Sequence, residues 1–224
     1  MIKFTRNRLL RVLDERIEKA LNRAKKKRKY INLSPECSEL KLPSSAKLIG
    51  AVEIKTLNNK KDNTVTVGEN TVLNNVLIDF CGSDCNVKFG DNVRFTGHII
   101  VSGDNRSVRI GDRTNARGVY ILAREANVSI GEDCLLSREI ELRTTDVHKI
   151  YSSESGKRLN EVKSDLVIED KVWVAAGVLV TKNVKVGKGS VIGARSLVTK
   201  DVPRKTVVGG IPARIIHENI TWER

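Results

Sequence analysis

The sequence predicts an all-β solenoid of triangular cross-section, and two repeating patterns indicate it. Residues 168–203 divide without a break into six units of six residues, each opening on Ile or Val and carrying Val or Ser in fifth place. A period of six fits a coil of three short strands, one on each side of a triangle, better than it fits a helix or a β-sandwich. The opening residue of each unit is therefore expected to point into a shared core.

A second pattern extends the solenoid upstream of the hexapeptides. In six places an apolar residue follows another apolar residue two positions earlier. The second residue of each pair stands at position 67, 89, 110, 130, 168 or 186, so the intervals are 22, 21, 20, 38 and 18. Three hexapeptides make 18 residues, so the early coils carry two to four extra residues as corner loops. The interval of 38 is one coil plus an insertion of about 20 residues, which is expected as a protruding loop over about residues 144–164.

The chain is expected to divide into three parts. Residues 1–45 would form a basic helix and a linker, residues 46–214 the solenoid, and residues 215–224 a short tail. In the first part, apolar residues recur at spacings of three and four, as on one face of a helix. They are Leu10, Leu13, Ile17, Ala20 and Ala24.

The positive charge of the chain is concentrated in the first part. Residues 1–30 hold 12 Lys and Arg against three acids, a net +9, and the whole chain carries +13, which leaves +4 for residues 31–224. The basic helix could cap the open end of the solenoid or pair with copies in an oligomer. Alternatively, residues 1–29 could bind an acidic polymer or an anionic membrane surface. Nothing nearby resembles a nucleic-acid recognition module, so no nucleic-acid partner is expected.

The composition also bounds the location and the metal content. No stretch approaches 18 apolar residues and the N-terminus lacks an apolar signal core, so a cytoplasmic protein is expected, at most peripheral to the inner membrane face. Cys81 and Cys85 are a weak zinc signal without a second pair nearby, and reduced thiols are the expected state. Cys134 holds a small fifth position and is expected in the core.

The candidate for catalysis is one of three histidines. His148 lies inside the insertion, and a loop extruded from a rigid solenoid is a suitable place for a catalytic group. An imidazole commonly removes a proton from a hydroxyl near neutral pH. A zinc-dependent hydratase would need three converging imidazoles, but the spacing of His98, His148 and His217 pairs no two of them on neighbouring coils. No metal site is therefore expected.

Four motifs carry a resemblance to a known family over roughly residues 60–216. They are Asp146-Val-His148, Val172-Trp-Val-Ala-Ala-Gly177, the segment 193–203 and Gly209-Gly-Ile-Pro-Ala-Arg214. Together they resemble the hexapeptide-repeat O-acetyltransferases, which implies a left-handed parallel β-helix and acetyl-CoA as donor. The chain is most similar to the branch of the maltose and galactoside acetyltransferases and the bacterial polysaccharide or polysialic acid O-acetyltransferases.

The resemblance implies roles for seven residues. His148 would be the general base on the acceptor hydroxyl, and Trp173 would line the pocket beside it. Five others would contact CoA: Ala176 and Ala194 along the pantetheine arm, and Thr199, Lys200 and Arg214 at the adenosine and phosphate end. Members of this family are trimers with active sites between subunits, so the resemblance implies a homotrimer. Direct transfer in a ternary complex is expected on a separate ground, because no Cys or Ser sits beside His148 in the sequence to suggest an acyl-enzyme.

The resemblance identifies the acceptor less closely than it identifies acetyl-CoA as the donor. A sugar hydroxyl is the family default, and the basic N-terminal segment favours an acidic polymer such as a sialic-acid-containing capsule. This segment and the residues Glu169 and Ala175, where Gly is usual, depart from the family pattern. Asp146 is a candidate for orienting His148, and the loose candidates for the acceptor pocket are Asn115, Arg117, Glu139 and Glu141.

Two other function classes compete with O-acetyl transfer. An N-acyltransferase acting on an amino sugar nucleotide usually has a nucleotide-binding N-terminal domain, and residues 1–60 hold no Gly-rich strand–turn–helix. A non-catalytic β-helix scaffold would need neither a histidine loop nor cations for CoA.

Overall fold

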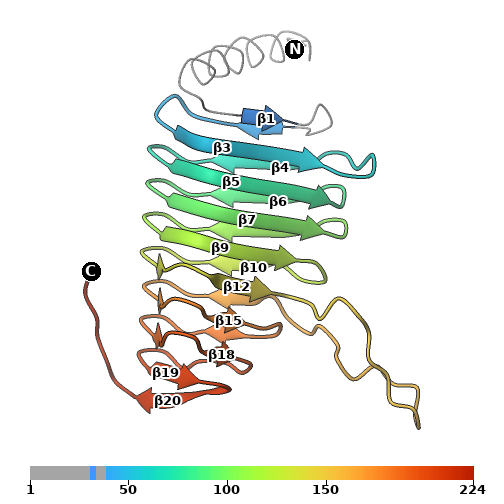
Figure 1. The fold of residues 1–224 in the computed structure, drawn as a ribbon, viewed down its shortest axis with the longest axis vertical. Coiled ribbons are helices and arrows are strands. Elements are labelled where there is room, and N and C mark those ends of the chain that lie inside the picture. Colours follow the sequence, from blue (N-terminus) through green and yellow to red (C-terminus); the bar gives the residue numbers. More distant parts are fainter. Residues whose placement is uncertain (1–30, 34–38) are drawn as a thin grey trace, which may run out of the picture.

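The computed structural model describes residues 31–33 and 39–224, which form a left-handed parallel β-helix. The coils stack in one column from β1 (Ile31–Leu33) to β20 (Ala213–His217) (Figure 1). Within these residues there is no helix, and hence none that could cross a bilayer. The basic helix predicted over residues 1–29 lies outside the described residues.

Each coil contributes strands to three faces. The first face is a seven-stranded parallel sheet. Its strands are β2 (Glu39–Lys41), β4 (Thr64–Val67), β6 (Asn86–Phe89), β8 (Ser107–Ile110), β10 (Val128–Ile130), β13 (Leu166–Ile168) and β16 (Lys185–Val186).

In the early coils, one long strand bends across the second and third faces. These strands are β3 (Lys47–Thr56), β5 (Val72–Cys81), β7 (Arg94–Ser102) and β9 (Asn115–Ala123). The later coils use separate short strands, because a turn interrupts each coil at that corner. On the second face these are β11 (Leu135–Leu136), β14 (Trp173–Val174), β17 (Val191–Ile192) and β19 (Val207–Gly210). On the third face they are β12 (Ile140–Arg143), β15 (Leu179–Val180) and β18 (Leu197–Val198).

The register confirms the sequence pattern residue by residue. The six positions singled out at 67, 89, 110, 130, 168 and 186 pair with one another in order, as one continuous ladder of the first face. The opening residues of the hexapeptides, Ile168, Val174, Val180, Val186, Ile192 and Val198, are all buried. Cys134 is also in the core, where burial raises the pKa of its thiol to about 11.

Both ends of the solenoid differ slightly from the predicted boundaries. β1 and β2 precede residue 46, because β1 adds to the third face by pairing with Val52–Ile54 of β3. At the other end, the chain reverses after β19, and β20 pairs antiparallel with β19 as far as His217. Residues 215–217 are therefore part of a strand, and the tail begins at Glu218.

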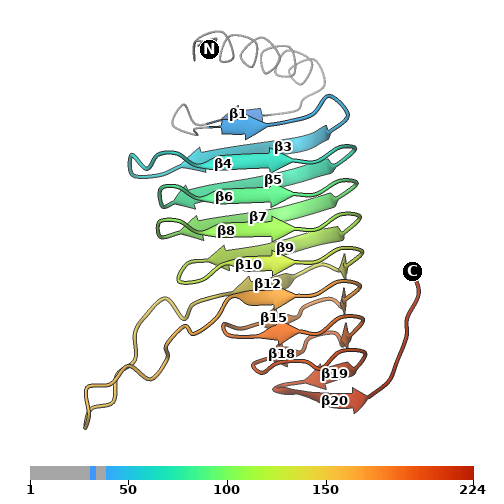
Figure 2. The same cartoon turned by 180° about the vertical axis from the view of Figure 1, so that it is seen from behind.

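The insertion leaves the solenoid between β12 and β13, where the chain passes from the third face back to the first. It protrudes well beyond the coils (Figures 1 and 2). The same corner takes the extra residues of the early coils: Ile78 and Phe89 are 11 positions apart, whereas the equivalent Val180 and Val186 are six apart. Loops that depart from the hexapeptide repeat therefore gather at one edge of the molecule.

Candidate active site

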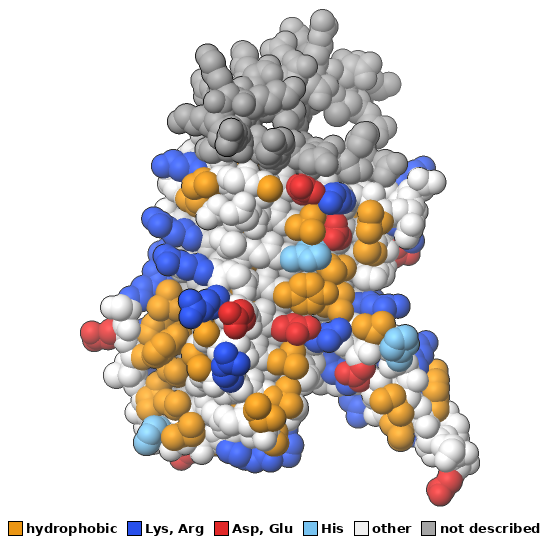
Figure 3. Space-filling model, in the orientation of Figure 1, with side chains coloured by type: hydrophobic (Ala, Val, Ile, Leu, Met, Phe, Trp, Pro, Cys, Tyr) orange, Lys and Arg blue, Asp and Glu red, His pale blue; other side chains and the backbone are white. Residues whose placement is uncertain are grey.

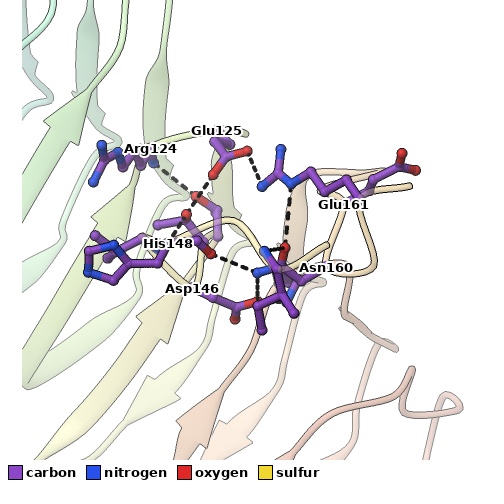
Figure 4. Close-up of polar contacts among 12 residues, drawn as sticks. Arg124, Glu125, Asp146, His148, Asn160 and Glu161 are labelled. Carbon is purple, nitrogen blue, oxygen red and sulfur yellow. Dashed lines mark hydrogen bonds and ion pairs between the residues drawn. The ribbon is translucent and has the colours of Figure 1, made fainter. Parts of the chain in front are cut away.

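A γ-turn at the base of the insertion presents His148. The His148 N–H donates to the Asp146 carbonyl oxygen at 2.8 Å, and the intervening Val147 has φ +68°. This positive-φ form of the turn is rare and strained, the more so for a β-branched residue. His148 itself is exposed, and its imidazole points away from the polar network around it (Figure 4). The ring is therefore open to a substrate or a neighbouring molecule.

Asn160 holds this turn from the far strand of the loop. Its amide donates to the Asp146 carboxylate at 2.9 Å and to the His148 carbonyl oxygen at 2.8 Å (Figure 4). Lys182, in the corner after β15, also bonds the Asp146 carboxylate. The hydrogen bond from Lys182 holds the pKa of Asp146 below its ordinary value. Asp146 thus acts on the backbone of His148 through Asn160, and its carboxylate is occupied by partners other than the imidazole.

A second ion pair ties the insertion to the preceding coil. Glu125, in the corner after β9, accepts bonds from Thr145 Oγ1 at 2.8 Å and from Arg158 at 2.7 Å. Burial alone would raise the pKa of Glu125, but these two hydrogen bonds outweigh it and lower that pKa. Both strands of the insertion are therefore anchored to rigid coils, which suits a loop that carries a reacting group.

Trp173 lies on a different face from His148. It opens β14 on the second face, whereas the insertion follows β12 on the third. Its side chain is 42% exposed and packs against Trp222 of the C-terminal tail, with ring centroids 6.1 Å apart. The two residues predicted to be catalytic are thus on separate faces of one chain.

Ala176 and Ala194 occupy equivalent turns of consecutive coils. Trp173 pairs with Val191 and Leu179 with Leu197, so the two alanines stack at the corner between the second and third faces. The backbone joins them, since the Arg195 N–H donates to the Ala176 carbonyl oxygen at 2.8 Å. Ala194 is exposed and Ala176 partly so. Their small side chains leave the backbone of this corner accessible to an extended ligand.

Thr199, Lys200 and Arg214 line one hollow at the C-terminal end. Its volume is about 270 Å³, and β18, the following corner and β20 form its walls. The hollow brings together the three residues predicted for the adenosine and phosphate end of CoA, although Arg214 is 14 positions beyond Lys200. Two cations at one hollow suit the oxygens of phosphate groups.

A second hollow, of about 400 Å³, lies on the third face. Glu139 and Glu141 line it together with His98 and Tyr120. His98 Nε2 lies 2.8 Å from an Asp79 carboxylate oxygen, and its ring meets Tyr120 edge-on. The other two loose acceptor candidates, Asn115 and Arg117, lie on the second face, where Arg117 Nε donates to Asn115 at 3.2 Å. The four candidates therefore do not form one pocket.

The three histidines lie apart in the described part of the chain. No group of three or more His, Cys, Asp or Glu side chains gathers there. His98 is paired with Asp79, and His148 and His217 lie on the insertion and on β20. The histidines thus occupy three separate environments.

No protein-family model matches the chain. Individual proteins and solved structures do match it, and they agree with this architecture. A polysialic acid O-acetyltransferase of Neisseria meningitidis is 31% identical over 183 residues, which cover 81% of this chain and 84% of that protein. A polysialic acid O-acetyltransferase of Escherichia coli O1:K1 is 34% identical over 139 residues, 62% of this chain and 45% of that longer protein. The crystal structure of the polySia-specific acetyltransferase NeuO matches with a TM-score of 0.77 and 33% identity, over 87% of this chain and 88% of that one.

A triangular β-helix of hexapeptides with a histidine on a long insertion defines the hexapeptide-repeat acyltransferase class. The similarity to the meningococcal protein extends over most of both chains. The chain belongs to the hexapeptide-repeat O-acetyltransferases, the family of the relatives just described.

Two residues that contact the candidate site residues were not predicted from the sequence. Asn160 lies in the insertion, which has no repeat register from which its contact with His148 could be inferred. Trp222 lies in a tail without periodicity, and the single available signal was that it is one of only two tryptophans in the chain.

Proposed function

We propose that the protein transfers the acetyl group of acetyl-CoA to a hydroxyl of a sialic-acid-containing polysaccharide. Relatives named polysialic acid O-acetyltransferases support the acceptor class. The donor is a cytoplasmic metabolite, so a cytoplasmic location is part of the proposal. The single observation that carries the reaction type is the strained, doubly anchored turn that exposes the His148 ring.

A basic stripe on the second face supports an anionic acceptor. Arg94 and Arg117 lie on the second face and Arg138 lies at its corner with the third face; all three are exposed and belong to three successive coils. Within the described residues, none of these guanidinium groups pairs with a carboxylate, although acids are abundant elsewhere on the coils. Figure 3 shows Lys and Arg side chains along this edge of the molecule. A polymer with one carboxylate per residue would find repeated guanidinium partners there.

The chemistry assigned to His148 is general-base catalysis. The imidazole takes the proton of the acceptor hydroxyl while that oxygen bonds to the thioester carbonyl carbon. The carbon–sulfur bond then breaks, and the imidazolium returns the proton to the departing thiolate of CoA. The residues fit this donor: the hollow with Lys200 and Arg214 suits phosphates, and the corner of Ala176 and Ala194 leaves room for the pantetheine arm.

The placement of His148 and Trp173 on different faces supports an assembly with shared active sites, which we propose to be a homotrimer. The insertion also exposes large apolar side chains, Ile150 and Tyr151 at 54% and Leu159 at 64%. Such side chains on a protruding loop are suited to contact another subunit. We infer that the insertion of one subunit reaches the second face of its neighbour and brings His148 opposite that subunit's Trp173.

Replacement of His148 tests the catalytic assignment. His148→Ala should reduce acetyl transfer by about 10²–10⁴-fold, because the hydroxyl loses its base, and should leave CoA affinity unchanged. His217→Ala, an exposed histidine outside the insertion, is the matched control and should retain full turnover. Near-normal turnover of His148→Ala would eliminate this residue as the base.

Mixing inactive variants tests the shared site. His148→Ala and Trp173→Ala subunits should each be poorly active alone. Co-expressed, they should regain part of the activity, because some interfaces then combine an intact His148 with an intact Trp173. A mixture no more active than its components, in particles shown to contain both variants, would contradict a site built by two subunits.

An acceptor panel tests the substrate class and separates the competing functions. Acetyl-CoA turnover should be fastest with polymers or oligomers of sialic acid, and mass spectrometry should locate the acetyl group on oxygen. KM for the polymer should rise steeply with salt, and less steeply after deletion of residues 1–29 if that segment gathers the polymer. An amide product would favour an N-acyltransferase acting on an amino sugar nucleotide, and failure to bind CoA at all would favour a scaffold.

A further inference from the structure

The C-terminal tail runs back along one corner of the solenoid and donates hydrogen bonds to three of the coils there. The Ile220 N–H donates to the Lys205 carbonyl oxygen at 3.0 Å, the Trp222 indole N–H to that of Lys171 at 3.1 Å, and the Arg224 guanidinium to that of Arg113 at 2.6 Å. Lys205, Lys171 and Arg113 all have left-handed backbone conformations and occupy the same corner of different coils. Figures 1 and 2 show this ascending tail. The tail is thus bound at defined points along one edge.

The tail brings together the only two tryptophans of the chain. The rings of Trp222 and Trp173 are 6.1 Å apart and inclined by 51°. The bond from the indole N–H to Lys171 fixes the orientation of the Trp222 ring. Even with Trp222 beside it, Trp173 remains 42% exposed. The pair is therefore an open, angled aromatic surface and not a sealed piece of core.

This aromatic pair lies on the same face as the basic stripe. Trp173 pairs with Leu135, which pairs with Asn115, and Asn115 pairs with Arg94. Moving along the second face, a ligand would pass from guanidinium groups to the two indoles within a few coils, at about 4.8 Å per coil. Figure 3 shows the corresponding order, with basic side chains above hydrophobic ones on this side.

We propose that Trp222 is a binding residue for the acceptor, which with Trp173 forms a wall against which one sugar ring of an anionic glycan packs. A sugar ring has an apolar C–H face and a hydroxylated edge, and an aromatic ring offers the matching apolar surface. The carboxylates of neighbouring sugars would meet Arg94, Arg117 and Arg138. This assignment rests on the proposed function, because it places the glycan on the face that also carries Trp173.

Steady-state kinetics with an oligosialic acid of defined length test the role of Trp222. Trp222→Ala should raise KM for the acceptor about tenfold, a loss typical of removing one aromatic partner, while KM for acetyl-CoA stays within about twofold. Trp222→Phe retains a ring and should have a smaller effect. Arg224→Ala removes an anchor of the tail and retains both indoles, so it is the control for loosening the tail alone.

Intrinsic fluorescence provides a second measurement that does not require turnover. The two tryptophans are the whole indole signal of the protein, so adding oligosialic acid should change the emission saturably, and Trp222→Phe should weaken the apparent affinity. A saturable change in emission without any turnover would support glycan binding at Trp173 and Trp222 but refute the proposed reaction. Turnover with no response, or an unchanged acceptor KM in Trp222→Ala, would overturn the inference. Equal losses in both KM values together with a lower melting temperature would reduce the tail to a structural strap and would also overturn it.

Discussion

Asn160 donates a hydrogen bond to the carbonyl oxygen of His148, at 2.8 Å, and so joins the two strands of the insertion at the candidate base. The same amide holds the Asp146 carboxylate at 2.9 Å. One side chain therefore fixes both ends of the γ-turn that presents the imidazole. The precision of the His148 position depends on this amide more than on any contact of the imidazole itself.

Removal of that amide should affect catalysis selectively. Asn160→Ala should lower kcat about tenfold or more, because even small misplacement of a catalytic group is costly, while CoA affinity is unchanged. Steady-state kinetics and CoA titration measure the two effects. Glu161→Ala changes the next, exposed side chain of the loop and is the control. If both variants have the same kcat, the amide does not position His148.

The strained backbone conformation of Val147 leads to a second prediction. A non-glycine residue with φ +68° costs on the order of 1–3 kcal/mol, and glycine would relieve that cost. Val147→Gly should therefore not lower the melting temperature, yet kcat should fall, because the freed turn no longer holds His148 in one place. Val147→Ala retains most of the strain and should remain more active. A fully active Val147→Gly enzyme would show that the strained turn has no part in catalysis.

The hexapeptide ladder could be predicted to the residue because its signal is repeated. Val67 and Ile168 are 101 positions apart in sequence and nevertheless belong to one ladder, since each coil restates the rule that an apolar residue must face the core. The position of the insertion followed from the same arithmetic. β1 was missed because three residues carry no period of their own, and its pairing with β3 is a tertiary contact.

The interior of the site was predictable to a smaller extent. His148 could be singled out by its place on the insertion, but the γ-turn and the contact with Asn160 depend on how the two strands of one irregular loop meet. Similarly, the meeting of Trp173 and Trp222 is a contact across 49 positions, made by a tail whose sequence has no repeat. Contacts of this kind depend on three-dimensional packing that local patterns do not encode.

The ion pairs of the insertion predict its response to acid. Asp146 and Glu125 have ordinary pKa values of 3.8 and 4.5, and both are lowered in the folded protein by hydrogen bonds, from Lys182 and Asn160 and from Thr145 and Arg158. A carboxylate with a depressed pKa stabilises the fold above its ordinary pKa and loses that contribution as the pH falls through the folded value. The insertion should therefore stay anchored at neutral pH and loosen below about pH 4.

Hydrogen exchange measured by mass spectrometry, corrected for the intrinsic rate at each pH, checks this prediction. Protection of the peptide covering residues 144–164 should fall with acidification before that of the coil peptides. Glu125→Gln should show lower protection already at neutral pH, since its ion pair with Arg158 is lost. Loss of protection in the loop and the coils at the same pH would mean that these pairs do not govern the loop separately.

Two glycines with left-handed backbone provide a matched test of coil packing. Gly97, where β7 bends from the second face to the third, has φ +149°, and a Cβ there would lie 2.0 Å from the Val119 carbonyl oxygen. Gly156, in the insertion, has φ +67° and nothing within 4 Å of such an atom. Gly97→Ala should cost at least about 2 kcal/mol, as strain adds to a clash with the next coil. Gly156→Ala should cost about 1 kcal/mol, confined to the loop. Thermal unfolding should show a drop of several degrees for the first variant alone, and equal midpoints would contradict the tight approach of β7 and β9 at this bend.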